Sequence, residues 1–146
     1  YKMLHLPDGL SQDSLHMLMT CEPQIKEIGD LISRTDVLLF GIGTAMRMAD
    51  QRHIADDVRK QLVDNHAVGE ALGQYCDIDG KLIYSTNNIG LSLPDVAKIP
   101  NVIAVAGGQD KSSAIIGVMR ACQKGILIID EQAAEGMRQL LQISAL

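Results

Sequence analysis

The clearest chemical signal in the sequence is a glycine turn between an apolar run and a helical pattern. Residues 102–106 (VIAVA) predict a buried strand, Gly107 and Gly108 begin a polar turn that ends at Lys111, and residues 112–117 (SSAIIG) begin a helical pattern. A strand that turns through glycines into a helix gathers backbone N–H groups at the helix N-terminus, and this arrangement binds phosphate. Lys111 adds a positive charge in the first helical turn, where the helix dipole disfavours it. We therefore expect a negatively charged ligand opposite Lys111.

The same turn also fits a simpler interpretation, which is a tight connection from strand to helix with a solvated lysine. Its spacing does not match the GxxxxGK(S/T) pattern of a P-loop, and this argues against a nucleoside triphosphate. The two interpretations predict the same backbone, so the pattern alone leaves them open.

A second glycine turn follows another apolar run. Residues 37–40 (VLLF) predict a buried strand, and residues 41–44 (GIGT) lead from it into a helix. The segment resembles half of a dinucleotide-binding fingerprint, but Met46 stands where the third glycine belongs, and no acidic residue ends a strand about 20 residues later. The sequence therefore argues against a dinucleotide. Because ligands of parallel sheets gather at the carboxyl ends of the strands, we expect both glycine turns on the same side of the sheet.

Two charged residues between the turns have a functional and a structural interpretation. Arg52 ends the helix after residue 43, where a cation complements the helix dipole, but a guanidinium there could also reach a phosphate or sugar oxygens. Glu70 is either a surface carboxylate or an acceptor of hydrogen bonds from sugar hydroxyls. The four histidines show no metal-ligand spacing, and no metal site or cofactor is expected.

The elements that would position these residues alternate between short apolar strands and amphipathic helices. Residues 1–6 predict a strand, Ser11 caps a helix, Pro23 begins another, and further helices are expected at 55–63 and after Asp130. Residues 72–78 and 81–86 flank Asp79-Gly80, which is a hairpin signal. This order predicts the α/β class, with a mainly parallel sheet covered on both faces and an antiparallel hairpin near its edge.

Length and composition indicate one domain, residues 1–146. The net charge of −5 argues against nucleic-acid binding through a basic face, and no apolar run approaches the ~18 residues of a membrane span. Three widely spaced cysteines, Cys21, Cys76 and Cys122, are expected as core residues in a reducing compartment, which favours the cytoplasm. The chain begins at Tyr1 inside an expected strand, and this predicts a fragment whose earlier part is absent.

Three stretches in order along the chain resemble the effector-binding domain of SorC-type transcriptional regulators: YKMLHLPDGLS at the start, VGEALGQYCDIDGKLIY across the hairpin, and VIAVAGGQDKSSAI at the glycine turn. The resemblance implies a Rossmann-like fold related to sugar-phosphate isomerases and deaminases, and a phosphorylated sugar as effector, with fructose-1,6-bisphosphate the leading candidate. It also implies a homo-oligomeric repressor whose DNA-binding helices precede this segment, together with another glycine- and threonine-rich loop of the site.

Carried over residue by residue, the resemblance places ten residues around the sugar phosphate: Gly41, Ile42, Gly43, Thr44, Arg52, Glu70, Gly107, Gly108, Gln109 and Lys111. A shift of one position would exchange Arg52 for Gln51. Two hypotheses follow, a binding module without catalytic residues and a sugar-phosphate isomerase or deaminase. The enzyme needs a base near the substrate carbon, for which Glu70 and then Asp110 are the candidates.

Overall fold

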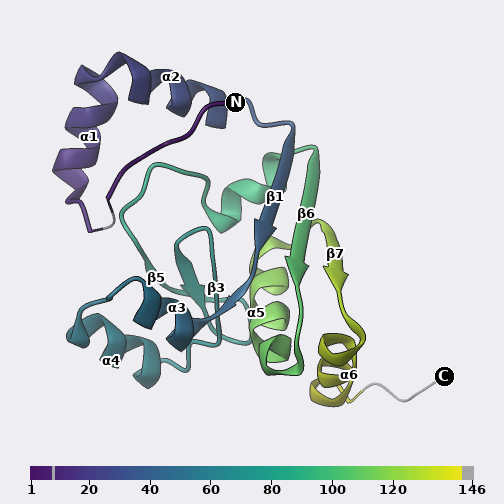
Figure 1. Ribbon diagram of the computed structural model, residues 1–146. Helices are drawn as coiled ribbons and strands as arrows, with labels where there is room; N and C mark the ends of the chain where they lie inside the picture. The colour runs from purple at the N-terminus through teal and green to yellow at the C-terminus, as the bar shows by residue number, and fades with distance from the viewer. Residues whose placement is uncertain (8, 143–146) are drawn as a thin grey trace.

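The computed structural model describes residues 1–7 and 9–142 (Figure 1). The helices are α1 (Gln12–Cys21), α2 (Pro23–Ile32), α3 (Ala45–Gln51), α4 (Asp56–Asp64), α5 (Ser112–Cys122) and α6 (Glu131–Leu140), with 3₁₀ turns η1 (Leu93–Lys98) and η2 (Gln109–Lys111). The strands are β1 (Val37–Gly41), β2 (Gly43–Thr44), β3 (Gly69–Ala71), β4 (Gln74–Cys76), β5 (Leu82–Ser85), β6 (Asn101–Ala106) and β7 (Ile126–Ile129).

The predicted strand at residues 1–6 is wrong. This segment has no secondary structure, and Tyr1 and Met3 are exposed. A strand needs a neighbour for its backbone hydrogen bonds, and the segment pairs with neither sheet of the described residues. The two helices that follow are confirmed: the Ser11 hydroxyl accepts the Ser14 N–H at 3.1 Å, and Pro23 lies in the first turn of α2.

The parallel strands form a sheet in the order β1-β6-β7. One face of this sheet packs on α5, where Phe40, Val102 and Ala104 meet Ala114, Ile115 and Val118 in the main core. Figure 1 shows α5 behind these strands, and α5 also contacts β3 of the second sheet. Helix α5 therefore lies between two sheets and begins at the edge where the parallel strands end.

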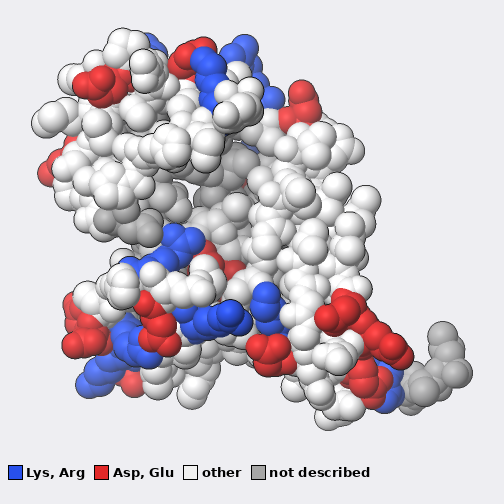
Figure 2. Space-filling view, in the orientation of Figure 1, with Lys and Arg blue, Asp and Glu red and all other residues white. Residues whose placement is uncertain are grey.

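The opposite face of the parallel sheet is apolar and exposed in the part of the chain that the structure describes. Its side chains are Val37, Leu39, Val105, Ile126 and Ile128, each between 41% and 67% exposed. Figure 2 shows the surface over β1, β6 and β7 almost free of charge. The α/β class is confirmed. Helices were expected on both faces of the parallel sheet, but no described helix packs on this outer face. These strands are continuous apolar runs with apolar side chains on both faces, which is typical of strands buried on both sides.

The predicted hairpin belongs to a separate antiparallel sheet with the order β2-β3-β4-β5. Its turn is confirmed: Gly80 has φ +84°, and the Asp77 carboxylate accepts the N–H groups of Asp79 and Lys81. β4 is shorter than predicted at its start because Leu72 and Gly73, with φ +55° and +77°, form the turn after β3, and the register of β4 and β5 shifts between Tyr75 and Cys76. The sheet packs on α3 and α4 around a second core of Ala45, Ala49, Leu62 and Tyr75.

Two of the three cysteines are in the core, as expected. Cys76 and Cys122 are buried, and burial raises the pKa of their thiols to about 12 and about 11. Cys21 lies exposed on α1, so the expectation is wrong for this residue. Thiols with raised pKa values are poor nucleophiles, so neither buried cysteine is a candidate for catalysis.

Candidate functional site

The two glycine turns lie side by side, as the sequence predicts. β1 and β6 are parallel neighbours, with Gly41 opposite Val105, so both strands end at the same edge. The Ile42 N–H donates to the Val105 carbonyl at 3.3 Å across this edge. Beyond it, β2 contacts η2, which brings residues 43–44 against residues 109–111.

The turn at Gly107 and Gly108 has a conformation that requires glycine. Gly108 has φ +95° and ψ 140°, a combination that side-chain-bearing residues essentially do not adopt. The chain then passes through η2 into α5, where the Lys111 N–H donates to the Gly108 carbonyl at 3.2 Å. The first N–H groups of a helix have no partner within it, so Gln109 and Asp110 present their amides at this end.

Lys111 stands at the N-cap of α5 and is half-buried. Its ammonium group forms no ion pair with any residue in 1–7 or 9–142. A cation at this end of a helix is opposed by the helix dipole. The turn therefore combines amide donors with a positive charge that an anion would neutralise.

Glu70 lies on β3 and is 3% exposed. Its Oε1 accepts the Gly73 N–H at 2.7 Å and forms an ion pair with Arg52 Nη2 at 3.3 Å. Burial raises the pKa of the Glu70 carboxyl, while Arg52 and the Gly73 N–H act in the opposite direction. A buried carboxylate is stable only with such partners, so Arg52 and Glu70 act as one unit.

The antiparallel sheet brings this charged pair to the glycine turns. Gly43 of β2 is the pairing partner of Glu70, and the Glu70 Oε2 atom faces Gly43. Arg52 follows the last residue of α3 and reaches Glu70, whereas Gln51 is exposed. The structure thus brings together all the segments that the sequence selected, and it gives Arg52 a specific partner in addition to the end of its helix.

Asp130 also belongs to this region, although its place in the sequence predicts only a helix cap. The cap is confirmed by the 2.8 Å hydrogen bond from the Ala133 N–H to Oδ1. The other oxygen, Oδ2, accepts the Gly108 N–H at 2.9 Å. Asp130 directly follows β7, the third parallel strand, so its position at the carboxyl end of a strand was the signal that could have found it.

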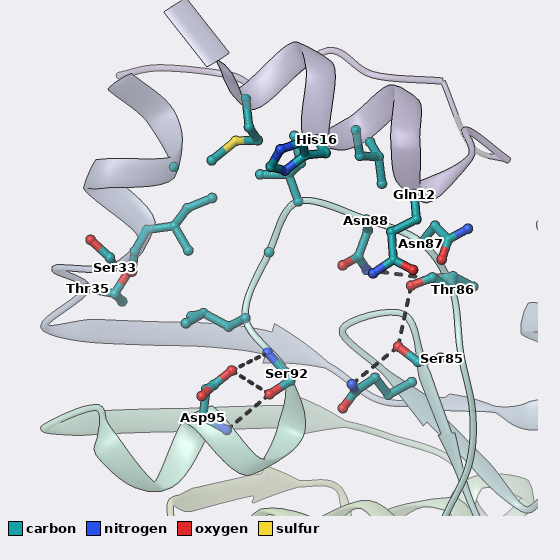
Figure 3. Close-up of a pocket in the computed structure, with 18 of the residues that line it drawn as sticks. Gln12, His16, Ser33, Thr35, Ser85, Thr86, Asn87, Asn88, Ser92 and Asp95 are labelled. Atoms are coloured by element: carbon teal, nitrogen blue, oxygen red, sulfur yellow. Dashed lines mark hydrogen bonds between the residues drawn. The ribbon is translucent and has the colours of Figure 1, made fainter. Parts of the chain in front are cut away.

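A cavity lies elsewhere, between the α1–α2 pair and residues 85–99, with a volume of about 1020 Å³ (Figure 3). Polar side chains line it, and several already bond to the protein: Gln74 Oε1 accepts the Leu93 N–H at 2.7 Å, and Asn88 donates to the Leu72 carbonyl at 3.1 Å. Its lysine, Lys98, is paired with Asp95 at 2.7 Å. Among the described residues that line this cavity, no lysine or arginine is left without an ion-pair partner to bind a phosphate.

Two further classes of site are not found in the described residues. No group of three or more histidine, cysteine, aspartate or glutamate side chains is arranged to hold a metal ion there. None of the helices described is long and apolar enough to cross a membrane.

Residues 1–139 match the family model described as "Putative sugar-binding domain", and the chain belongs to this family, the effector-binding domain of SorC-type transcriptional regulators. Among curated proteins, the chain is 36% identical over 135 residues to the central glycolytic genes regulator of Bacillus subtilis, which covers 92% of this chain and 39% of that protein. The protein of the same name from Priestia megaterium is 38% identical over the same shares.

A solved structure of a "putative SorC family transcriptional regulator" from Enterococcus faecalis matches with a TM-score of 0.85 and 38% identity, covering 94% of this chain and 56% of that one. The full-length sorbitol operon regulator SorC of Klebsiella pneumoniae shares the fold. It is 22% identical, with a TM-score of 0.73, and the match covers 90% of this chain and 42% of that one. These relatives are regulators and not enzymes, and this favours the binding module over the isomerase or deaminase.

Proposed function

We propose that this chain is the ligand-sensing part of a bacterial transcriptional regulator and that its ligand is a phosphorylated sugar, fructose-1,6-bisphosphate. The observation that carries the proposal is Lys111, half-buried at the start of α5 without an ion-pair partner among the described residues. A phosphate opposite Lys111 would accept from the Gln109 and Asp110 amides and offset the unfavourable interaction with the helix dipole.

The neighbouring charged pair suits the remainder of such a ligand. Glu70 Oε1 is occupied by Gly73 and Arg52, while Oε2 faces Gly43 and is the oxygen that would accept from a sugar hydroxyl. Arg52 supplies a second positive charge, which a bisphosphate needs at its other end. The glycolytic role in the name of the two curated relatives supports a glycolytic sugar phosphate as the ligand.

The regulatory part of the proposal depends on the relatives. The chain spans 39% of the curated proteins that it matches, and those proteins are named as regulators of genes. We propose that ligand binding here changes the affinity for DNA of a separate DNA-binding part, in a homo-oligomer in the cytoplasm. A ligand shifts such an equilibrium only by its difference in affinity between two conformations.

Thermal unfolding of the domain tests the binding step. Fructose-1,6-bisphosphate at about 100 times its Kd should stabilise the folded state by about 2.7 kcal/mol, which is about 5–10 °C in Tm for a domain of this size. Fructose 6-phosphate should give a smaller shift, and fructose none. Inorganic phosphate at equal concentration is the control for a general anion effect.

The same samples distinguish the two function hypotheses. The sugar recovered after incubation should be chemically unchanged when its phosphate and carbonyl signals are measured by NMR. Turnover of any sugar phosphate would contradict a pure binding module. Equal shifts from inorganic phosphate and from the bisphosphate would contradict sugar recognition, and no shift with any sugar phosphate would contradict the proposed function itself.

A further inference from the structure

Both carboxylate oxygens of Asp130 bond to backbone N–H groups of different segments. Oδ1 accepts the Ala133 N–H at 2.8 Å and so caps α6, whereas Oδ2 accepts the Gly108 N–H at 2.9 Å, 22 residues earlier in the chain. A cap needs only one acceptor oxygen, and serine serves as well as aspartate at this position. The second bond is therefore not explained by helix capping.

The Asp130–Gly108 bond holds the glycine turn at the residue where its backbone is most unusual. Gly108 has φ +95°, and its carbonyl accepts the Lys111 N–H, so its orientation sets the start of α5. A second hydrogen bond links α6 to this turn: the Ser112 hydroxyl donates to the Ala133 carbonyl of α6 at 3.3 Å, and it also lies 2.7 Å from the Gln109 carbonyl, to which it donates as well. Helix α6 thus supports the turn on both sides of Lys111.

We propose that Asp130 is a positioning residue of the sugar-phosphate site: its carboxylate fixes the Gly108 peptide so that the Gln109 and Asp110 amides and the Lys111 side chain face one anion. This inference rests on the proposed function. It also specifies which amides donate to the phosphate. These are the amides of Gln109 and Asp110, because the Gly108 N–H already donates to Asp130.

The sign of the effect separates positioning from simple charge. A carboxylate near a phosphate repels it, so if Asp130 acted only through its charge, its removal would strengthen phosphate binding. If Asp130 positions the turn, its removal weakens binding although a repelling charge is lost. The loss expected for one backbone hydrogen bond is about three- to tenfold in Kd.

Two variants test the inference in the domain. Asp130→Ser keeps an acceptor for the Ala133 N–H but has no second oxygen for Gly108, and Asp130→Asn keeps one carbonyl oxygen and places an N–H₂ group where Oδ2 accepts. Asp130→Ala, which loses both bonds, measures the contribution of the cap. Kd for fructose-1,6-bisphosphate is measured by titration calorimetry, and amide hydrogen exchange is measured at Gly108 and Ala133.

The expected result has two parts. In Asp130→Ser the Gly108 amide exchanges faster while the Ala133 amide stays protected, and both Asp130→Ser and Asp130→Asn bind the bisphosphate about three- to tenfold more weakly than the wild type. Wild-type affinity in a variant whose Gly108 amide exchanges fast would overturn the inference and leave the proposed function intact. If the bisphosphate did not bind to the wild type, the proposed function would be wrong. If the Gly108 amide exchanged at the same rate in Asp130→Ser as in the wild type, the Asp130–Gly108 hydrogen bond would not hold the turn, and the inference would be wrong.

Discussion

The segments Gly41–Thr44 and Gly107–Lys111 both follow a strand of the parallel sheet, yet they continue in different ways. The first becomes β2, which pairs with β3 and aligns Gly43 with Glu70. The second turns at Gly108 through η2 into α5. Both follow an apolar run and begin with glycine, and neither local sequence specifies whether the chain continues as a strand or as a helix.

From this difference we propose different roles for the two turns in one site. In the first, the backbone is committed to a strand ladder, and the Ala45 N–H donates to the Val68 carbonyl at 3.0 Å. That turn contributes by holding Glu70 and Arg52 in place. In the second, a glycine-only conformation leaves the first amides of a helix and the charge of Lys111 at the sheet edge. Under the proposed function, the second turn is the one that would bind the anion.

Replacement of the lysine should have the largest effect on binding. Lys111→Ala is expected to lose about 1.5–3 kcal/mol of binding free energy, about 10- to 150-fold in Kd for fructose-1,6-bisphosphate, because it removes a charged partner of the phosphate. Lys81→Ala is the matched control, since Lys81 is exposed beside the hairpin turn, at the opposite end of α5. Equal losses in the two variants, measured by calorimetry, would refute the assignment of the anion to the second turn.

Alanine at the two glycines compares the turns directly. Gly108→Ala should destabilise the domain by about 1–3 kcal/mol, because alanine is strained at φ +95° whatever space surrounds it. In Gly43→Ala the added Cβ would meet Cγ and Sδ of Met48, so the Met48 side chain must adopt another rotamer, and we expect a smaller cost of about 1 kcal/mol. Urea unfolding measures both. If Gly43→Ala proved the more damaging variant, the first turn would be the strained one.

The charged pair of the first turn should show itself in the pH dependence of stability. The pKa of Glu70 is raised in the folded state, so the folded protein binds this proton more tightly than the unfolded chain does. The resulting stability is complete below the ordinary pKa of 4.5 and is lost as pH rises through the raised value. Relative to Glu70→Gln, the wild type should therefore lose stability as pH increases from 4 to 8.

Urea unfolding of the wild type and Glu70→Gln across that pH range measures this difference. The variant keeps an oxygen that can accept the Gly73 N–H, so the comparison isolates the charge. A difference in unfolding free energy that stayed constant, or that moved in favour of the wild type as pH rose, would show that Glu70 is not held in a desolvating environment.

The smallest effect is expected at the far end of α5. Arg120 contacts Asp79 at 3.2 Å and the Ile78 carbonyl at 3.0 Å, and both charged side chains are well exposed, at 45% and 82%. Arg120→Ala should cost about 0.5 kcal/mol or less and leave Kd unchanged, because exposed ion pairs contribute little. A large change in Kd from this variant would mean that α5 does not act through its N-terminal end alone.

Local patterns in the sequence were sufficient to predict the strand-to-helix turn at Gly107 and the hairpin turn. The apolar run at 102–106 followed by Gly107 and Gly108 specifies a strand and then a reversal, and Asp79-Gly80 specifies its turn through the φ that glycine permits. Because parallel neighbours end at one edge, the proximity of the two glycine turns could be deduced as well.

Features that depend on distant partners could not be deduced in this way. Residues 1–6 have the composition of a strand but pair with no strand in the described part of the chain, and Thr44 joins β2 because β3 lies beside it. The second bond of Asp130 joins residues 22 positions apart and has no local signature. Exposure of the outer face of the parallel sheet also depends on what packs there, which strand periodicity does not encode.

We propose that the Gly107–Lys111 turn, and not the Gly41–Thr44 turn, binds the phosphate. This can be tested by titrating the ¹⁵N-labelled domain with fructose-1,6-bisphosphate and following the amide chemical shifts. We expect the largest shifts at the Gln109, Asp110 and Lys111 amides and smaller ones at the Gly43 and Glu70 amides, which stay in the strand ladder. Largest shifts at residues 41–44, or at residues 85–92 that line the separate cavity, would contradict it.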